Sequence, residues 1–291
     1  MDNLLATPRH VAGLSDLTDR YRVLLCDVWG VLHNGVVSHK PAVDALIQHR
    51  AAGGIVLLIS NAPRPGAAVD KQLLGFDVDL GCRDGIITSG DAAKAFLAER
   101  SGASVYHLGP DWDHFIYEGT SVDLVDLDDA ELVSCVGFID DATETVDDYS
   151  ALLGAMVARG LPMLCANPDL VVERGDRLVP CAGALAARYE ELGGTAIIVG
   201  KPHQPIYEQA LAEIRQLAGA DTRRSDILAI GDGIGTDMVG ATAFGLDALF
   251  IASGIHASET TDHQTSATEA VSELLGGHNA RAIGFMPQLK W

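Results

Sequence analysis

The sequence VLLCDVWG, residues 23–30, decides the fold of this chain. Its first four residues are all apolar, which is typical of a parallel strand that is covered on both faces. Asp27 ends this run and is followed by a loop containing glycine, so the pattern predicts that Asp27 lies at the carboxyl edge of a parallel sheet. Ligands bind at this edge in open α/β proteins. Asp27 is therefore a candidate nucleophile or metal ligand, although a turn-forming aspartate would give the same local pattern.

Predicted strands and helices alternate on either side of this stretch. Residues 7–17 predict a short amphipathic helix, and Pro41 to about Ala52 predicts a second one that ends at Gly53-Gly54. Buried strands are predicted at 55–59, at 195–199 and at 227–230. This alternation predicts an α/β fold built on a parallel sheet.

The middle of the chain has a different pattern, with shorter strand candidates and an acidic stretch over residues 123–148. We therefore predict a main domain over residues 1–100, an inserted smaller α/β domain over 101–198, and the remainder of the main domain over 199–291. The strand at 195–199 is expected to return the chain to the main sheet.

Composition excludes several classes of function. The 291 residues are 48% hydrophobic and 21% charged, which suffices for a substantial core, and no apolar run is long enough to cross a bilayer. A formal net charge of -20 without clustered Lys and Arg excludes a nucleic-acid polymer as a partner. The first 14 residues carry charges and a proline where a secretory signal needs an apolar core. We therefore expect a cytoplasmic protein without a membrane partner.

Polar side chains follow four of the predicted strands. In chain order these residues are Asp27, Ser60 with Asn61, Lys201, and Asp232 with Asp237. Because the carboxyl ends of parallel strands share one edge of a sheet, we expect these groups to gather there. Together they suit phosphoryl transfer, in which a protein mainly positions groups and neutralises charge.

The three carboxylates suit a nucleophile and a metal site. Asp27 could attack phosphorus to give an aspartyl phosphate. Asp27 and Asp232 could hold Mg²⁺, a hard ion that prefers carboxylate oxygens and water. Asp237, one helical turn farther on, could orient a metal-bound water or Lys201. Taken alone, Gly231-Asp232-Gly233 could equally be a tight turn.

The remaining groups suit a phosphate. The Ser60 hydroxyl and the backbone N–H of Asn61 could donate to a phosphoryl oxygen, and Lys201 could pair with both the phosphate and Asp27. Each has a structural alternative, since Ser60 could cap a strand and Lys201-Pro202 could form a surface turn. Their occurrence in this order, each after an apolar strand, favours the functional interpretation.

These motifs resemble those of the haloacid dehalogenase-like (HAD) hydrolase superfamily, in the subclass with a type IIA cap. The resemblance covers nearly the whole chain and rests on four motifs at 27–31, 58–61, 200–202 and 231–237, and on cap elements at 166–169 and 181–185. It implies a Rossmann-like core with an α/β cap inserted between the second and third motifs.

The same resemblance implies Mg²⁺-dependent hydrolysis of a small phosphomonoester, such as a nucleotide, sugar phosphate or cofactor phosphate, through phospho-Asp27. It implies that the cap loop after Asn167-Pro168 closes over the leaving group, which makes Asp169 a candidate substrate contact; a turn-forming role is the alternative. Cap-mediated homodimers are common in this subclass.

Position 29 departs from the family pattern. Phosphatases of the family usually carry a second Asp there, as the general acid for the leaving alcohol and then the base for water, whereas this chain has Trp29. The backbone carbonyl of Trp29 could still bind Mg²⁺. Because general acid–base catalysis contributes about 10²- to 10⁴-fold, we expect slow hydrolysis or good leaving groups only, unless His33 or His203 substitutes. The sequence favours a solvated loop histidine at position 33 over this catalytic role.

Two other functions stay open. The first is a phosphate-ligand binding or regulatory protein that has kept the motifs and lost turnover. The second is a metal-independent dehalogenase, a branch that also has an aromatic residue at this position, although the spacing of Asp232 and Asp237 favours a metal-dependent enzyme.

Overall fold

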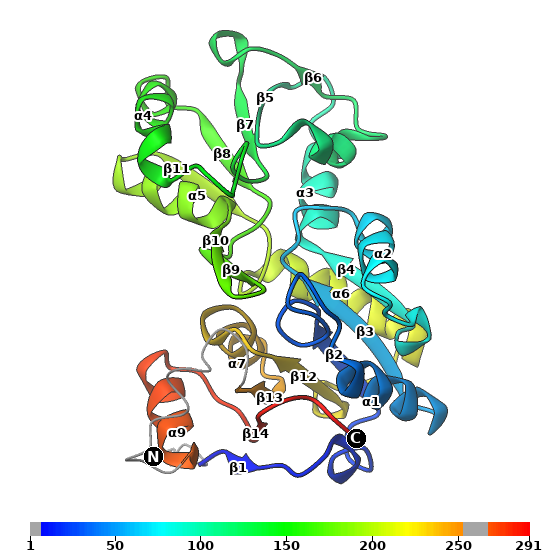
Figure 1. Cartoon of the computed structure of the whole chain (residues 1–291). Coiled ribbons are helices and arrows are strands. Elements are labelled where there is room, and N and C mark those ends of the chain that lie inside the picture. Colours follow the sequence, from blue (N-terminus) through cyan, green and yellow to red (C-terminus); the bar gives the residue numbers. More distant parts are fainter. Residues whose placement is uncertain (1–6, 253–266) are drawn as a thin grey trace, which may run out of the picture. The chain divides into compact units, whose positions relative to one another are not determined.

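The computed structural model describes residues 7–252 and 267–291 (Figure 1). These residues form two compact units. The first unit comprises the described residues within 1–59, 70–86 and 207–291, and the second comprises residues 60–69 and 87–206. The domain boundaries predicted at 100/101 and 198/199 stay predictions.

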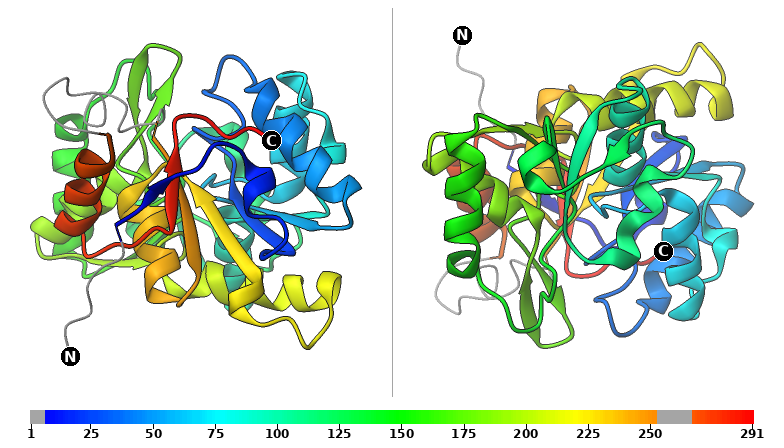
Figure 2. Two further views of the ribbon diagram at one scale, coloured as in Figure 1. Left: turned by 90° about the horizontal axis from the view of Figure 1, so that it is seen from below. Right: turned by 90° about the horizontal axis from the view of Figure 1, so that it is seen from above.

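A seven-stranded sheet in the order β1-β14-β13-β12-β2-β3-β4 confirms the predicted α/β fold. Figure 2 shows that strands from both ends of the sequence share it: β2 pairs in parallel with β12 on one side and with β3 on the other. Its strands are β1 (Arg9–His10), β2 (Val23–Asp27), β3 (Ile55–Ser60), β4 (Gly85–Thr88), β12 (Ile227–Gly231), β13 (Asp247–Ile251) and β14 (Gly284–Met286).

The order of the strands reverses between β2 and β12. The chain moves outward from β2 through β3 to β4, and in the opposite direction from β12 through β13 to β14. In open α/β sheets the ligand site lies beyond the carboxyl ends of the strands at such a reversal. Asp27, the last residue of β2, and Asp232, the residue after β12, therefore lie at the expected place.

The helices begin and end where the sequence places their signals. Pro41 lies in the first turn of α1, and Gly53, at φ +89°, follows its C-cap residue Ala52. Thr88 caps α3 through a reciprocal pair of hydrogen bonds with Asp91. The α-helices are α1 (Lys40–Ala51), α2 (Gly66–Gly75), α3 (Ser89–Ala98), α4 (Ser150–Ala158), α5 (Ala182–Glu191), α6 (Gln204–Ala218), α7 (Val239–Ala243) and α9 (Ala267–Gly277).

The second unit is built on a five-stranded sheet in the order β11-β8-β7-β5-β6. Alternate residues of β7 enter opposite hydrophobic clusters, Val133 and Cys135 on one face and Leu132 on the other, so both faces are covered. A separate antiparallel pair consists of β9 and β10. The strands of this unit are β5 (Ser104–Leu108), β6 (Asp123–Leu124), β7 (Leu132–Cys135), β8 (Pro162–Cys165), β9 (Val171–Arg174), β10 (Arg177–Pro180) and β11 (Thr195–Ile198).

Two predictions about individual segments are wrong. Residues 7–17 contain strand β1 and a 3-10 turn at Leu14–Asp16 in place of an amphipathic helix, because β1 pairs with β14 from the far end of the chain. The strand before Lys201, β11, pairs with β8 in the five-stranded sheet and does not return the chain to the main sheet.

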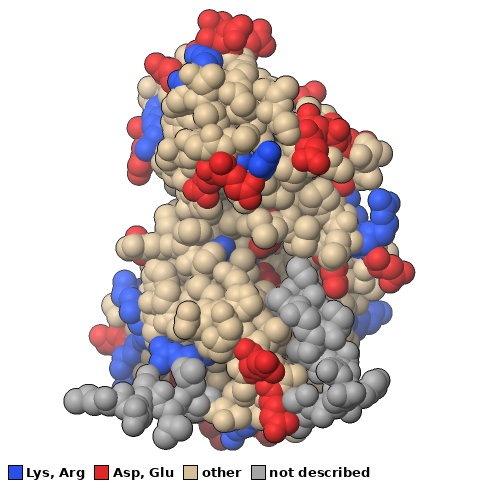
Figure 3. All heavy atoms as spheres, turned by 90° about the vertical axis from the view of Figure 1, so that its left-hand side faces the viewer, with Lys and Arg blue, Asp and Glu red and all other residues tan. Residues whose placement is uncertain are grey.

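Within the described residues, no helix is both long and apolar enough to span a membrane. On the face drawn in Figure 3, the described Lys and Arg side chains form small separate groups, among acidic ones, rather than a continuous basic band.

Candidate active site

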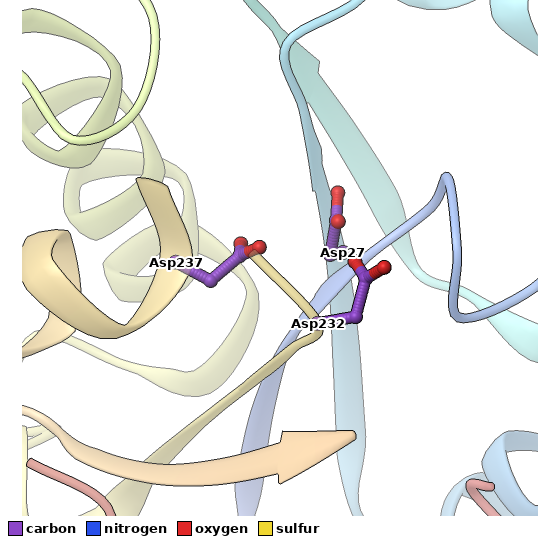
Figure 4. A group of neighbouring side chains, drawn as sticks. All are labelled: Asp27, Asp232 and Asp237. Atoms are coloured by element: carbon purple, nitrogen blue, oxygen red, sulfur yellow. The ribbon is translucent and has the colours of Figure 1, made fainter. Parts of the chain in front are cut away.

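Three buried carboxylates meet at the reversal point of the seven-stranded sheet. Asp27, Asp232 and Asp237 each offer an oxygen within 4.8 Å of the others, and their exposed fractions are only 6%, 7% and 4%. Figure 4 shows Asp27 at the end of β2 and Asp232 in the loop after β12 side by side, with Asp237 directed toward them from the helical segment that follows this loop.

The main chain at two glycines packs directly against the carboxylates of this cluster. A Cβ atom on Gly30, which has φ +82°, would lie 2.1 Å from Oδ2 of Asp232, and one on Gly231 would lie 2.2 Å from Cγ of Asp237. Only glycine fits at either position without displacing a carboxylate. Asp237 lies in a π-helical turn, Ile234–Met238, and its Oδ2 accepts a hydrogen bond of 3.1 Å from the N–H of Gly233.

The donor set fits a divalent hard cation. Three buried carboxylates this close repel one another strongly in a medium of low dielectric constant, so a bound cation would stabilise the folded arrangement. All donors are oxygens, the ligands that Mg²⁺ and Ca²⁺ take in proteins. These residues could therefore hold a metal ion with one carboxylate positioned for attack on a ligand.

Trp29 and His33 pack together in the loop after β2. Their rings make an edge-to-face contact with centroids 4.8 Å apart, and the Phe76 ring lies beside His33 with centroids also 4.8 Å apart. His33 is 1% exposed, so the expectation of a solvated loop histidine is wrong, and its Nδ1 accepts a hydrogen bond of 2.9 Å from the N–H of Gly35. Burial lowers the pKa of His33 to about 4. The imidazole is therefore neutral at physiological pH and carries no proton on Nδ1 to give to a leaving group.

In the second unit, Asn61 contacts two of the other predicted site residues. Its Oδ1 accepts a hydrogen bond of 2.7 Å from the N–H of Lys201, and its Nδ2 donates to the carbonyl of Lys201 at 3.2 Å and to Oδ1 of Asp169 at 2.8 Å. Lys201, which is 2% exposed, is one of the largest fully buried side chains of the described residues. A buried ammonium group needs polar or negatively charged partners to offset the loss of its hydration.

The Ser60 hydroxyl has a structural contact of the kind expected for a strand end. It accepts a hydrogen bond of 3.2 Å from the N–H of Ala62. Ser60 is also the residue after Ile59, the register partner of Asp27 in the β2–β3 pair. The contact uses the oxygen as an acceptor and leaves the hydroxyl proton to be donated elsewhere.

Asn167 was not among the residues singled out from the sequence. Its Oδ1 accepts a hydrogen bond of 3.1 Å from the N–H of Asp169, and the residue is buried. The run Asn167-Pro168-Asp169 carries the signal of such a turn, because Asn often bonds the main chain two residues on. The turn-forming contact thus belongs to Asn167, whereas the Asp169 carboxylate bonds Asn61.

Within each unit, predicted site residues lie close together. Asp27, Asp232 and Asp237 lie together in the first unit, and Asn61, Asp169 and Lys201 lie together in the second. His203 is exposed, and burial of part of its ring lowers its pKa. The role of each residue in catalysis, including metal binding by the Trp29 carbonyl, stays a prediction.

Two family models match the chain. Residues 24–120 match a model described as haloacid dehalogenase-like hydrolase, and residues 198–276 match one described as HAD-hydrolase-like. The first segment contains Asp27 and Ser60, and the second contains Lys201, Asp232 and Asp237.

Known proteins resemble the chain over nearly its full length. A crystal structure of a haloacid dehalogenase-like family hydrolase from Brucella suis is 42% identical, with a TM-score of 0.85 over 97% of this chain and 99% of the other. A 5′-nucleotidase, YutF, from Bacillus subtilis is 25% identical over 87% of this chain and 96% of its own length. An acid sugar phosphatase from Staphylococcus aureus is 24% identical over 88% and 98%.

Proposed function

This chain belongs to the haloacid dehalogenase-like hydrolase family, and from that membership we propose that it is a Mg²⁺-dependent phosphatase acting on a small phosphomonoester. Relatives named as a 5′-nucleotidase and an acid sugar phosphatase support this class of substrate. The observation that carries the proposal is the buried cluster of Asp27, Asp232 and Asp237 at the reversal point of the parallel sheet.

Asp27 is proposed as the nucleophile. One carboxylate oxygen of Asp27 attacks phosphorus, the bond from phosphorus to the leaving oxygen breaks, and an aspartyl phosphate forms. Water then attacks this phosphorus, which releases inorganic phosphate and regenerates the carboxylate. Mg²⁺ held by Asp27, Asp232 and the carbonyl of Trp29 would supply positive charge to the phosphoryl oxygens. Asp237 is proposed to orient the ligands of the metal from the π-helical turn.

Three further residues are proposed to contact the phosphate. Ser60 donates through its hydroxyl, Asn61 through its main-chain N–H, and Lys201 through its ammonium group. The hydrogen bonds between the Lys201 main chain and the Asn61 side chain support placing these two residues at one site. Asp169 is proposed to contact the substrate from the loop that precedes β9, and this loop would contribute to substrate choice.

Proton transfer is the step for which this chain is least equipped. Trp29 has no group that titrates, and the imidazole of His33 is neutral and bonded through Nδ1. We therefore propose that substrates with good leaving groups are hydrolysed faster, because a phenolate or similar anion can leave without being protonated.

A screen of phosphomonoesters tests the proposed function. Nucleotides, sugar phosphates, cofactor phosphates and p-nitrophenyl phosphate are incubated with the protein and Mg²⁺, with and without EDTA, beside Asp27→Asn. We expect phosphate release that EDTA and Asp27→Asn both abolish. Equal release by wild type and Asp27→Asn would contradict the nucleophile assignment.

The same screen separates the alternatives. A binding or regulatory protein would bind a phosphorylated ligand in a thermal-shift assay without releasing phosphate. A dehalogenase would release halide from a haloacid without metal, which the metal-type cluster of carboxylates argues against. Cytoplasmic location and a homodimer stay predictions.

A further inference from the structure

The side chain of Asn61 joins two loops of the second unit. It contacts the main-chain N–H and C=O of Lys201 and the carboxylate of Asp169, at 2.7, 3.2 and 2.8 Å. Both amide hydrogens and the amide oxygen take part. Reversing the amide would place oxygen against the Lys201 carbonyl and nitrogen against the Lys201 N–H, so the hydrogen-bond network fixes its orientation.

The packing around this side chain leaves it no alternative position. Asn61 is 3% exposed. A Cβ atom on Gly200 would lie 2.6 Å from Oδ1 of Asn61, 2.6 Å from Oγ of Ser89 and 2.7 Å from Cδ of Pro168. The Gly200 main chain is thus held directly against the Asn61 amide and the loop that carries Asp169.

The Asp169 loop is fixed from its other side by α5. A Cβ atom on Gly183, in the first turn of α5, would lie 2.2 Å from the carbonyl oxygen of Pro168 and 2.5 Å from that of Asp169. Together with the Asn167 turn, this contact holds the loop main chain in place. A movement of the loop would break the Asn61–Asp169 hydrogen bond and leave a buried amide hydrogen without its acceptor.

We propose that Asn61 is a positioning residue whose side-chain amide sets the Lys201 main chain and the Asp169 carboxylate relative to each other, so that these two residues act on substrate as one unit. The inference rests on the proposed function, which assigns the phosphate to Lys201 and a substrate contact to Asp169. It differs from the assignment of Asn61 as a phosphate ligand, because that contact uses the main-chain N–H, whereas the side chain is occupied by the two loops.

A double-mutant cycle tests the coupling. Asn61→Ala, Asp169→Ala and the double variant are compared with wild type for kcat and KM on the best substrate from the screen. Independent residues would give fold-losses in kcat/KM that multiply. The proposal predicts that the double variant is within about threefold of Asn61→Ala, because Asp169 has lost its link to Lys201 in both. Multiplied losses would overturn it.

The variant Asn61→Asp should change the pH dependence of kcat/KM, which the loss of a purely structural role would not do. Asn61→Asp places a carboxylate against Asp169, and two adjacent carboxyl groups share a proton with a raised pKa. The thiols of Cys165 and Cys181 interact electrostatically with Asp169, and burial raises the pKa of both, so these thiols stay neutral. The kcat/KM of Asn61→Asp relative to wild type should therefore rise as the pH falls from about 8 to about 5.

Exchanging the residues at positions 61 and 169 should restore part of the activity that Asn61→Asp loses. In Asn61→Asp with Asp169→Asn, the new amide at 169 donates to the new carboxylate at 61, which removes the repulsion between two carboxylates, although a carboxylate oxygen still faces the Lys201 carbonyl. We expect this pair to recover at least tenfold of the kcat/KM lost in Asn61→Asp and to lose the pH shift. Asn279→Asp is the matched control, because Asn279 is exposed and lies in the first unit, and it should match wild type throughout. A pair no better than Asn61→Asp would contradict the proposal.

Failure of this inference is distinguishable from failure of the proposed function. If wild type hydrolyses no phosphomonoester, the proposed function fails, and the same cycle is then measured by thermal unfolding. The coupling predicts that the loss of Tm in the double variant is clearly smaller than the sum of the single losses, whereas additive losses would overturn it. If Asn61→Ala does not fold, Asn61→Ser and Asp169→Asn provide the cycle with smaller changes.

Discussion

Trp29 and His33 occupy the loop in which the family usually carries its second carboxylate. Their rings pack edge to face, and burial keeps His33 neutral. Neither residue is therefore equipped to protonate a leaving alcohol at neutral pH. The residue type at position 29 is readable from the sequence, but the burial that disqualifies His33 follows from packing against Phe76, which is 43 residues away along the chain and could not be foreseen.

Restoring a carboxylate at position 29 should raise turnover. Trp29→Asp supplies a group that can protonate the leaving oxygen and then activate water, and general acid–base catalysis contributes about 10²- to 10⁴-fold. We expect a gain in kcat of at least tenfold on sugar phosphates, whose leaving alcohols are poor, and a smaller gain on p-nitrophenyl phosphate. Trp29→Asn is the control. An equal gain in both variants would mean that the size of the side chain, and not its acid, limits turnover.

His33 should make the folded state less stable as the pH falls. Its pKa is lowered by burial to about 4 in the folded chain, so the unfolded chain binds more protons below pH 6.5. The contribution of neutral His33 to the free energy of unfolding is fully present above about pH 6.5. It is lost progressively down to about pH 4, and the total loss is about 3 kcal/mol.

His33→Phe keeps the aromatic packing and removes this titration. The free energy of unfolding, measured by denaturant titration at several pH values, should fall less steeply between about pH 6.5 and about pH 4 than in wild type. Burial also lowers the pKa of His49, and this group continues to contribute in both proteins. Identical pH slopes would contradict a buried neutral His33.

Individual helices and strands were predicted correctly where residues close to them in the sequence determine where they begin and end. The helix from Lys40 to Ala51 ends before Gly53, as its proline and glycines indicate. The segment 7–17 was predicted as a helix from its periodicity, but Arg9–His10 pairs with β14, and no local signal announces a partner at the other end of the chain. The π-helical turn that presents Asp237 was likewise predicted only as ordinary helix.

The loop after β2 should not tolerate a side chain on Gly30. Gly30→Ala places an L side chain at φ +82°, which destabilises the folded state. It also places Cβ 2.1 Å from Oδ2 of Asp232, so the carboxylate cluster must shift. Gly53→Ala is the matched control, because Gly53 has φ +89° and no atom within 4 Å of the added Cβ.

Both variants should lose about 1 to 2 kcal/mol of stability from the backbone conformation. Only Gly30→Ala should lose phosphatase activity, by at least tenfold, with a raised Mg²⁺ requirement in a titration of activity against Mg²⁺. Normal Mg²⁺ dependence in a folded Gly30→Ala would show that the close approach to Asp232 is unimportant.

For the whole molecule, the sequence predicted the α/β class and the alternation of strands and helices. It did not predict correctly which sheet β11 joins. The apolar run at 195–199 has the composition of a buried parallel strand, which β11 is. Composition does not say which of two parallel sheets a strand joins, and β11 joins the one that contains β8. The grouping of Asp27 with Asp232 and Asp237 was predictable because all three follow strands of the sheet that reverses there.

Mg²⁺ should stabilise the whole protein against heat. Three buried carboxylates offer oxygens within 4.8 Å of one another that a divalent cation could bind, and a ligand that binds only the folded state adds about 2.7 kcal/mol at one hundred times its Kd. Thermal unfolding is measured with Mg²⁺ and with EDTA. We expect a higher Tm with Mg²⁺ in wild type and in the exposed control Asp128→Asn, and little change in Asp232→Asn. An equal rise in Asp232→Asn would place the ion elsewhere.

The covalent step is the most direct test of the account. The protein is mixed with the best phosphomonoester and Mg²⁺, quenched in acid during turnover, digested and analysed by mass spectrometry. The account predicts one phosphoryl group on the peptide that contains Asp27, absent from Asp27→Asn. Steady hydrolysis without this phosphorylated peptide, or the same modification in Asp27→Asn, would contradict it.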